Sequence, residues 1–80
     1  ARIVGYATSG VESHRVMSAP IPTVHKLLEQ TGRSMEDIDI LEHNEAFAAA
    51  SCAIQMTLGA SEGRFNPHGG AVAIGHPLGA

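Results

Sequence analysis

The fold of this chain is best inferred from the segment Gly69-Gly-Ala-Val-Ala-Ile-Gly-His-Pro-Leu-Gly-Ala80. Its apolar run, residues 71–74, has no polar face and predicts a short strand that is covered on both sides. Pro77 has the fixed φ that suits a first helical position, so His76 is expected at or just before a helix N-cap. Open α/β sheets place their chemistry at the carboxyl ends of buried strands, which makes His76 a candidate functional residue.

One helix and one helical turn are predicted upstream of that segment. Pro22 suits the start of a helix and Gly32 its end, and the apolar residues between them recur at helical spacing. Ser34 is followed three residues later by Asp37, which is a capping-box pattern. We therefore expect a single helical turn there, just before the next strand.

A second helix is predicted over residues 45–58, with Asn44 as its N-cap and Gly59 as its C-cap. After Glu45 its side chains are apolar on nearly every side, with only three polar interruptions. A helix of that kind is expected to be buried all round. Cys52 lies in the middle of it and is expected to be an inert, buried thiol.

Strands are predicted over residues 1–8, 38–43 and 71–74, which gives the order strand, helix, strand, helix, strand. This order predicts an α/β fold, namely a βαβαβ portion of a layered fold with a mostly parallel sheet and a buried helix. A helix covered on every side needs a layer that eighty residues cannot supply. Residues 1–80 are therefore expected to form a single, incomplete segment of a longer protein.

Composition excludes several classes of function. The net charge of −3, with only five Lys and Arg, leaves no basic surface for nucleic acid. The sequence has no apolar run long enough to span a bilayer, and its single cysteine cannot close an intrachain disulfide. The glycines match neither a P-loop nor a dinucleotide fingerprint. No metal site is expected from His43, Cys52, His68 and His76, because they lack ligand-pair spacing.

Two motifs, Asn44-Glu-Ala-Phe47 and Gly75-His-Pro77, resemble the C-terminal half of the thiolases. These are coenzyme A-dependent acyltransferases that make or break 3-ketoacyl thioesters. The resemblance implies that Asn44 holds a water which, with His76, forms an oxyanion hole for the thioester carbonyl. It also implies that His76 activates a nucleophilic cysteine. That cysteine and the family's second catalytic cysteine match no position of this chain, so residues 1–80 alone are expected to be inactive.

The resemblance also implies substrate contacts. Met17 matches a methionine at the pantetheine channel, and Ala46 and Phe47 match residues that line the acyl pocket. Core packing is the competing explanation for these three, and helix capping is the competing explanation for Asn44. His43 is interpreted as a neighbour at the strand end, because the motif that begins at Asn44 fixes the register without a gap.

As a whole, the resemblance implies an acyltransferase that acts on acyl-coenzyme A and coenzyme A as substrates, with no separate cofactor. It further implies a homodimer or homotetramer in the cytoplasm, or in the mitochondrial or peroxisomal matrix of a eukaryote. Two alternatives stay open. One is a ketoacyl-synthase-like condensing enzyme, and the other is a non-catalytic module of the same fold that binds coenzyme A or lipid.

Overall fold

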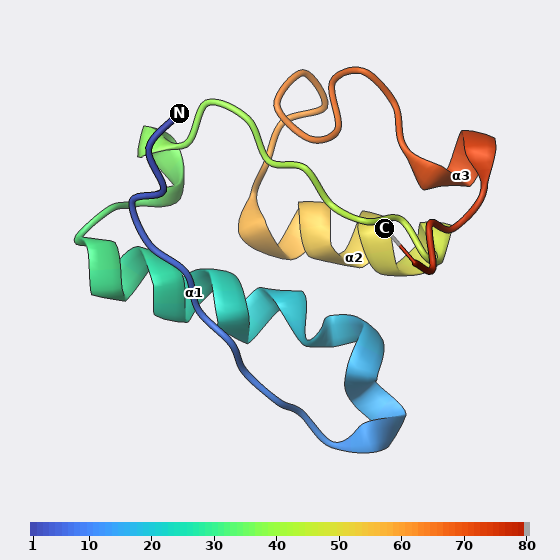
Figure 1. Cartoon of the computed structure of the whole chain (residues 1–80), viewed down its shortest axis with the longest axis horizontal. Coiled ribbons are helices and arrows are strands. Elements are labelled where there is room, and N and C mark those ends of the chain that lie inside the picture. The colour runs from blue at the N-terminus through green and yellow to red at the C-terminus, as the bar shows by residue number, and fades with distance from the viewer. Residues whose placement is uncertain (80) are drawn as a thin grey trace.

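The computed structural model describes residues 1–79, which form helices joined by long irregular connections (Figure 1). In chain order the elements are the 3-10 helix η1 (Ser13–Ser18), α1 (Pro20–Thr31), the 3-10 helix η2 (Met35–Asp37), α2 (Ala48–Leu58) and the short α3 (Ala71–Ile74). Regular pairing within residues 1–79 is limited to one isolated parallel bridge, between Leu41 and Phe65. None of the helices in this range is long and apolar enough to cross a membrane.

The βαβαβ order predicted from the sequence is not found in these residues. Residues 1–8 belong to no strand, and within 38–43 only Leu41 pairs, with Phe65. The prediction for residues 71–74 was wrong, because they form one turn of helix. A four-residue apolar run has too few residues for its period to separate strand from helix. A strand also exists only where neighbouring backbone bonds to it, and such neighbours are sparse here.

Helix α1 follows the sequence prediction closely at its end and begins two residues earlier than expected, at Pro20. Gly32 ends it in the left-handed conformation, at φ 66°. The predicted capping box is confirmed, because the backbone N–H of Ser34 donates to Asp37 Oδ2 at 2.8 Å and η2 follows as a single turn. This bond and a second one from the Ser34 hydroxyl to Asp37 Oδ2 hold the pKa of the Asp37 carboxyl below its usual range.

Helix α2 begins three residues later than predicted. Its N-cap is Phe47 rather than Asn44, and no side chain caps it. The first turn therefore also lacks an acidic residue, since Glu45 precedes the helix. The C-terminal end agrees with the prediction, because Gly59 ends α2 with a left-handed φ of 68°.

Only one face of α2 is buried within residues 1–79. Ser51, Ile54 and Leu58 lie on that face, whereas Met56 is 81% exposed. Cys52 is also exposed, so the expectation of an inert, buried thiol was wrong for this part of the chain. Within the described residues, no other segment covers the remaining apolar faces of α2.

The core lies where α2 meets α1 and the loop that follows α2. Ile54, Leu58 and Phe65 are its buried members. They are packed against partly buried apolar residues from the rest of the chain, namely Ile21, Val24, Met35, Leu41 and Ala60. The N-terminal stretch runs across α1 (Figure 1), where Gly5 lies against Leu27 and Thr31. The core thus fixes α2 and, through Leu41, the start of the segment that leads to it.

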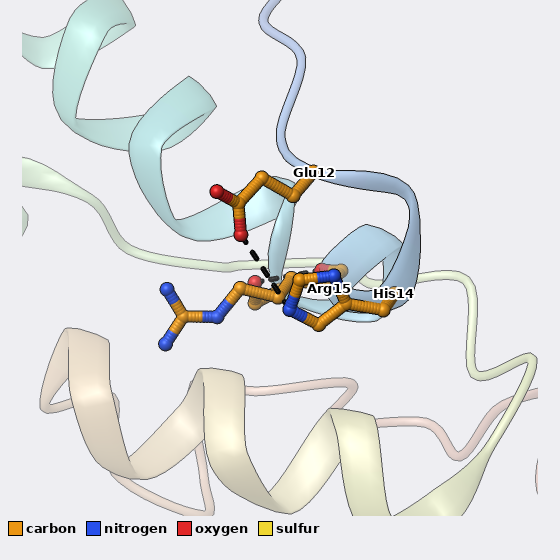
Figure 2. Close-up of polar contacts among 4 residues, drawn as sticks. Glu12, His14 and Arg15 are labelled. Atoms are coloured by element: carbon orange, nitrogen blue, oxygen red, sulfur yellow. Dashed lines mark hydrogen bonds and ion pairs between the residues drawn. The ribbon is translucent and has the colours of Figure 1, made fainter.

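The short helix η1 is stabilised mainly by its backbone. Arg15 N–H donates to the Glu12 carbonyl at 2.8 Å. Figure 2 shows the side chains of Glu12 and His14 facing each other, with 3.5 Å between Oε2 and Nε2. Both side chains are about three-quarters exposed, so this contact contributes little stability. Helix η1 contains Met17 and places this residue near Ala50 of α2.

Candidate active site

Asn44 and His76 lie side by side although 32 residues separate them in sequence. Asn44 Nδ2 is 3.4 Å from His76 Nδ1, and both residues are exposed. At that distance the contact is at the long end of a hydrogen bond, and the donor depends on the tautomer of the ring. Asn44 lies in the irregular segment before α2, and His76 follows Gly75, which ends α3 with a φ of 98°.

A cavity of about 310 Å³ brings four of the five predicted site residues together. We call it the Asn44–His76 cavity; it is lined by Met17, Asn44, Ala46 and His76, together with Val16, Pro20, His43 and Ala50. The fifth predicted residue, Phe47, does not line it. Its side chain is 62% exposed at the N-cap of α2.

The positions at helix N-termini predicted for Asn44 and His76 are not found within residues 1–79. Asn44 does not cap α2, because the cap position belongs to Phe47. His76 does not precede a helix in the described residues. Residues 77–79 form a turn instead, in which Leu78 N–H donates to the His76 carbonyl at 2.9 Å.

His43 also lines the cavity, but its ring is engaged by neighbouring side chains. Its Nδ1 lies 3.0 Å from Ser51 Oγ, and its ring is tilted against Phe65 with centroids 6.0 Å apart. Burial lowers the pKa of His43, and the nearby Glu45 carboxylate opposes that effect. A neutral His43 is therefore favoured, which fits a residue that orients the segment before Asn44.

Asn66 is a residue that sequence reasoning missed. Its side chain is 7% exposed and contacts the residues on both sides of Asn44. His43 N–H donates to Asn66 Oδ1 at 2.7 Å, while Asn66 Nδ2 donates to the His43 carbonyl at 3.0 Å and to Glu45 Oε1 at 2.9 Å. In the sequence, an Asn before Pro67 indicates only a turn. The left-handed backbone of Asn66, at φ 43°, is the one feature that this signal could have suggested.

Glu45 uses its second oxygen on another segment of the chain. Its Oε2 accepts a hydrogen bond of 3.0 Å from the backbone N–H of Val72 in α3. The hydrogen bonds from Asn66 and Val72 hold the pKa of the Glu45 carboxyl below its usual range. An ionised Glu45 thus links the Asn44 segment to the helix that leads to His76.

The one cysteine of the chain, Cys52, does not line the Asn44–His76 cavity. Cys52 lines a different cavity, of about 290 Å³, together with Glu45 and Asn66. Across this range no group of three or more His, Cys, Asp or Glu side chains is arranged to hold a metal ion.

Comparison with known proteins places the whole chain in one family. The sequence model described as "Thiolase, C-terminal domain" matches residues 1–80. The chain is 50% identical over 80 residues to an acetyl-CoA acetyltransferase of Rhizobium meliloti, and 48% identical over 80 residues to the cytosolic acetyl-CoA acetyltransferase of Mus musculus. In both cases it is covered completely and spans 20% of the relative.

A solved structure gives the same result for the fold. The crystal structure of the acetyl-CoA acetyltransferase of Bacillus anthracis matches 98% of this chain with a TM-score of 0.92 at 42% sequence identity. The chain covers 20% of that structure. The predicted thiolase-like fold is therefore confirmed, although the strand order predicted within it is not.

Proposed function

Because this chain belongs to the thiolase family, in its C-terminal domain, we propose that it supplies His76 and Asn44 to the active site of an acyltransferase. The substrates proposed are acyl-coenzyme A and coenzyme A. No separate cofactor is required, because the coenzyme A thioester carries the reacting acyl group. The rest of the active site, including both catalytic cysteines, would come from outside these eighty residues.

One observation supports this proposal more than any other. Asn44 Nδ2 and His76 Nδ1 lie 3.4 Å apart at a cavity that Met17 and Ala46 also line. An amide and an imidazole that line the same cavity can each donate an N–H hydrogen bond into it. Donors of this kind stabilise a thioester oxygen as negative charge develops on it.

The proposed reaction proceeds in two acyl-transfer steps. A cysteine thiolate attacks the thioester carbonyl, the new C–S bond forms, and the carbonyl electrons move to the oxygen. That oxyanion is bound by His76 and by a water held on Asn44. Its collapse breaks the bond to the coenzyme A sulfur and leaves an acyl-cysteine thioester. The acyl group then passes to another coenzyme A thiol or to the α-carbon of acetyl-coenzyme A. The acceptor gives up a proton, and the C–S bond to the cysteine breaks so that the cysteine leaves as its thiolate. Cleavage of acetoacetyl-coenzyme A by coenzyme A is the transfer to the α-carbon run in reverse.

The remaining roles are proposed with different support. Met17 and Ala46 line the Asn44–His76 cavity, which suits contacts to the pantetheine and acyl parts of the substrate. Phe47 is proposed as an acyl-pocket residue on family resemblance alone, because it lies outside that cavity. A homodimer or homotetramer in the cytoplasm is proposed on the same basis. The mouse relative's name includes "cytosolic".

The experiment uses the full-length enzyme that carries this chain and measures cleavage of acetoacetyl-coenzyme A by coenzyme A. His76→Ala is expected to lower kcat by about three or more orders of magnitude, because proton transfer and oxyanion stabilisation are both lost. The matched control is His25→Ala, which removes an exposed imidazole from α1. Equal activity of His76→Ala and wild type would refute the proposed role.

The two alternatives predict different results in the same assay. A non-catalytic module would bind coenzyme A thioesters without turning them over, whichever residue stands at position 76. A ketoacyl-synthase-like enzyme would condense acyl groups but would not cleave acetoacetyl-coenzyme A with free coenzyme A. Turnover that depends on His76 therefore supports the thiolase reaction over both.

A further inference from the structure

The side chain of Asn66 extends the isolated parallel bridge between Leu41 and Phe65. Around the Leu41–Phe65 bridge, Leu41 N–H donates to the Arg64 carbonyl at 2.8 Å and Asn66 N–H donates to the Leu41 carbonyl at 2.9 Å. The Asn66 amide group then takes the place of the next backbone unit. It bonds both the N–H and the carbonyl of His43, at 2.7 and 3.0 Å. The backbone that enters Asn44 is therefore fixed by a side chain.

The same amide group also fixes the residue after Asn44. Asn66 Nδ2 donates to Glu45 Oε1 at 2.9 Å as well as to the His43 carbonyl. Asn66 is 7% exposed, so little water competes for these bonds. One buried amide therefore binds the residues on both sides of Asn44.

Glu45 carries this connection to the segment that holds His76. Its Oε2 accepts from Val72 N–H at 3.0 Å, and Val72 lies in α3, which ends at Gly75 immediately before His76. Gly70 packs so closely on the carboxylate that a Cβ at position 70 would lie 2.6 Å from Glu45 Cδ. The carboxylate thus lies in a tight space between the two segments.

We propose that Asn66 and Glu45 are positioning residues, which set the separation of Asn44 and His76 through their hydrogen bonds to each other, to His43 and to Val72. This inference rests on the proposed function, because it concerns the geometry of the same site. Asn44 and His76 make only one long contact with each other, at 3.4 Å. Their separation is therefore set by the segments that carry them, and Glu45 joins those segments directly.

The first test exchanges the hydrogen-bonding partners in the full-length enzyme. Asn66→Asp removes the Nδ2 donor and places two carboxylates together, but it keeps the size of the side chain and its tolerance of positive φ. We expect kcat to fall about tenfold to a hundredfold, with KM changed less than about threefold, because misplaced catalytic groups slow the chemical step. Glu45→Gln should lower kcat by a smaller factor, since it keeps one acceptor.

The double variant Asn66→Asp with Glu45→Gln restores a bond with the roles reversed. The glutamine amide can donate to the new aspartate while its oxygen still accepts from Val72 N–H. We expect kcat to recover to within about fivefold of Glu45→Gln alone. If the two substitutions only destabilise the protein and position nothing, their separate effects on the logarithm of kcat should add up in the double variant. Additivity would therefore overturn the proposal. Glu29→Gln, an exposed residue on α1, is the control for removing one carboxylate.

A second test avoids any change of polar groups. Gly70 has φ −160°, which any residue adopts, so Gly70→Ala acts through the crowding of Glu45 and, less closely, of Asn66 Nδ2, which would lie 3.1 Å from the new Cβ. We expect kcat to fall by about tenfold. Gly63→Ala is the matched control, because a Cβ there meets nothing within 4 Å. A kcat for Gly70→Ala within twofold of the Gly63→Ala value would overturn the Glu45 link to α3.

The outcomes separate this inference from the proposed function. If His76→Ala abolishes turnover while the Asn66, Glu45 and Gly70 variants retain wild-type kcat, the proposed function stands and the positioning inference fails. If wild-type enzyme shows no turnover, the proposed function fails. In that case the Asn44 Nδ2 to His76 Nδ1 distance in crystal structures of the wild type and Asn66→Asp tests the positioning by itself, and an unchanged distance would overturn it.

Discussion

Removing the side chain of Asn44 is expected to slow the reaction without destabilising the protein. Asn44 is exposed, and α2 is capped at Phe47, so truncation removes no helix cap. Within residues 1–79 its one side-chain hydrogen bond is the 3.4 Å contact to His76. We therefore expect Asn44→Ala to change the free energy of unfolding by less than about 0.5 kcal/mol, whereas loss of a true cap costs about 1 kcal/mol.

The effect on catalysis should be much larger. Loss of one donor from an oxyanion hole lowers kcat by roughly ten- to a thousandfold, which corresponds to about 1.4 to 4 kcal/mol of transition-state stabilisation. Asn44→Asp keeps the size of the side chain but has no N–H to donate, and its charge repels the developing oxyanion. Its kcat should fall at least as far as that of Asn44→Ala.

Both quantities are measured on the full-length enzyme, by urea unfolding and by cleavage of acetoacetyl-coenzyme A. A loss of more than about 1 kcal/mol in Asn44→Ala, with kcat unchanged, would mean that Asn44 is structural after all. Near-normal kcat in a folded Asn44→Asp enzyme would refute the oxyanion-hole role directly. The exposed Asn44 side chain makes the two outcomes easy to distinguish.

Two further predictions concern stability. Ile54→Ala, which opens a cavity between Leu58 and Phe65, should lower the free energy of unfolding by about 2 to 5 kcal/mol in a urea titration, and an unchanged midpoint would contradict the assigned core. Burial lowers the pKa of His43, and hydrogen bonding lowers the pKa of Glu45. Each group therefore contributes stability that is present above its pKa in the unfolded chain. That stability is lost as the pH falls through its lower pKa in the folded protein. Melting temperatures should therefore fall as the pH falls from about 7 to about 4. His43 acts before Glu45, because the ordinary pKa of an imidazole lies above that of a carboxyl, and His43→Gln should flatten the upper part of that decline.

Local signals in the sequence predicted most of the helix ends. Gly32 and Gly59 both end helices with positive φ, as a residue without a Cβ does at little cost. The capping box at Ser34 and Asp37 was also predicted, because it needs only residues within one turn. Helix ends and capping boxes of this kind depend on residues that are close in sequence, so the sequence alone is enough to predict them.

The strands and the start of α2 were predicted less well, because they depend on distant partners. Asn44 is a favourable N-cap by type, but Glu45 bonds to Asn66 and Val72 instead, and the helix begins only after Phe47. Residues 71–74 are apolar enough for either a strand or a helix. The start of α2 and the structure of residues 71–74 depend on contacts between residues more than twenty positions apart. A local sequence pattern does not predict such contacts.

For the site, the proximity of Asn44 and His76 was implied by family resemblance, and Asn66 was not anticipated. The two motifs mark the residues that the resemblance assigns to the chemistry. Asn66 lies in a loop before Pro67, where its residue type indicates only a turn. Its contacts to His43 and Glu45 exist only after the loop folds back along residues 41–43.

Position 66 should therefore be among the least substitutable in the chain, although it lies in a loop. Glycine would suit the left-handed backbone but would leave both backbone groups of His43 without their partner. Aspartate would fit the space but repel Glu45, and alanine would satisfy neither requirement. In a deep mutational scan, tolerance should drop sharply at this residue while exposed residues nearby, such as Glu62 and Gly63, accept most replacements.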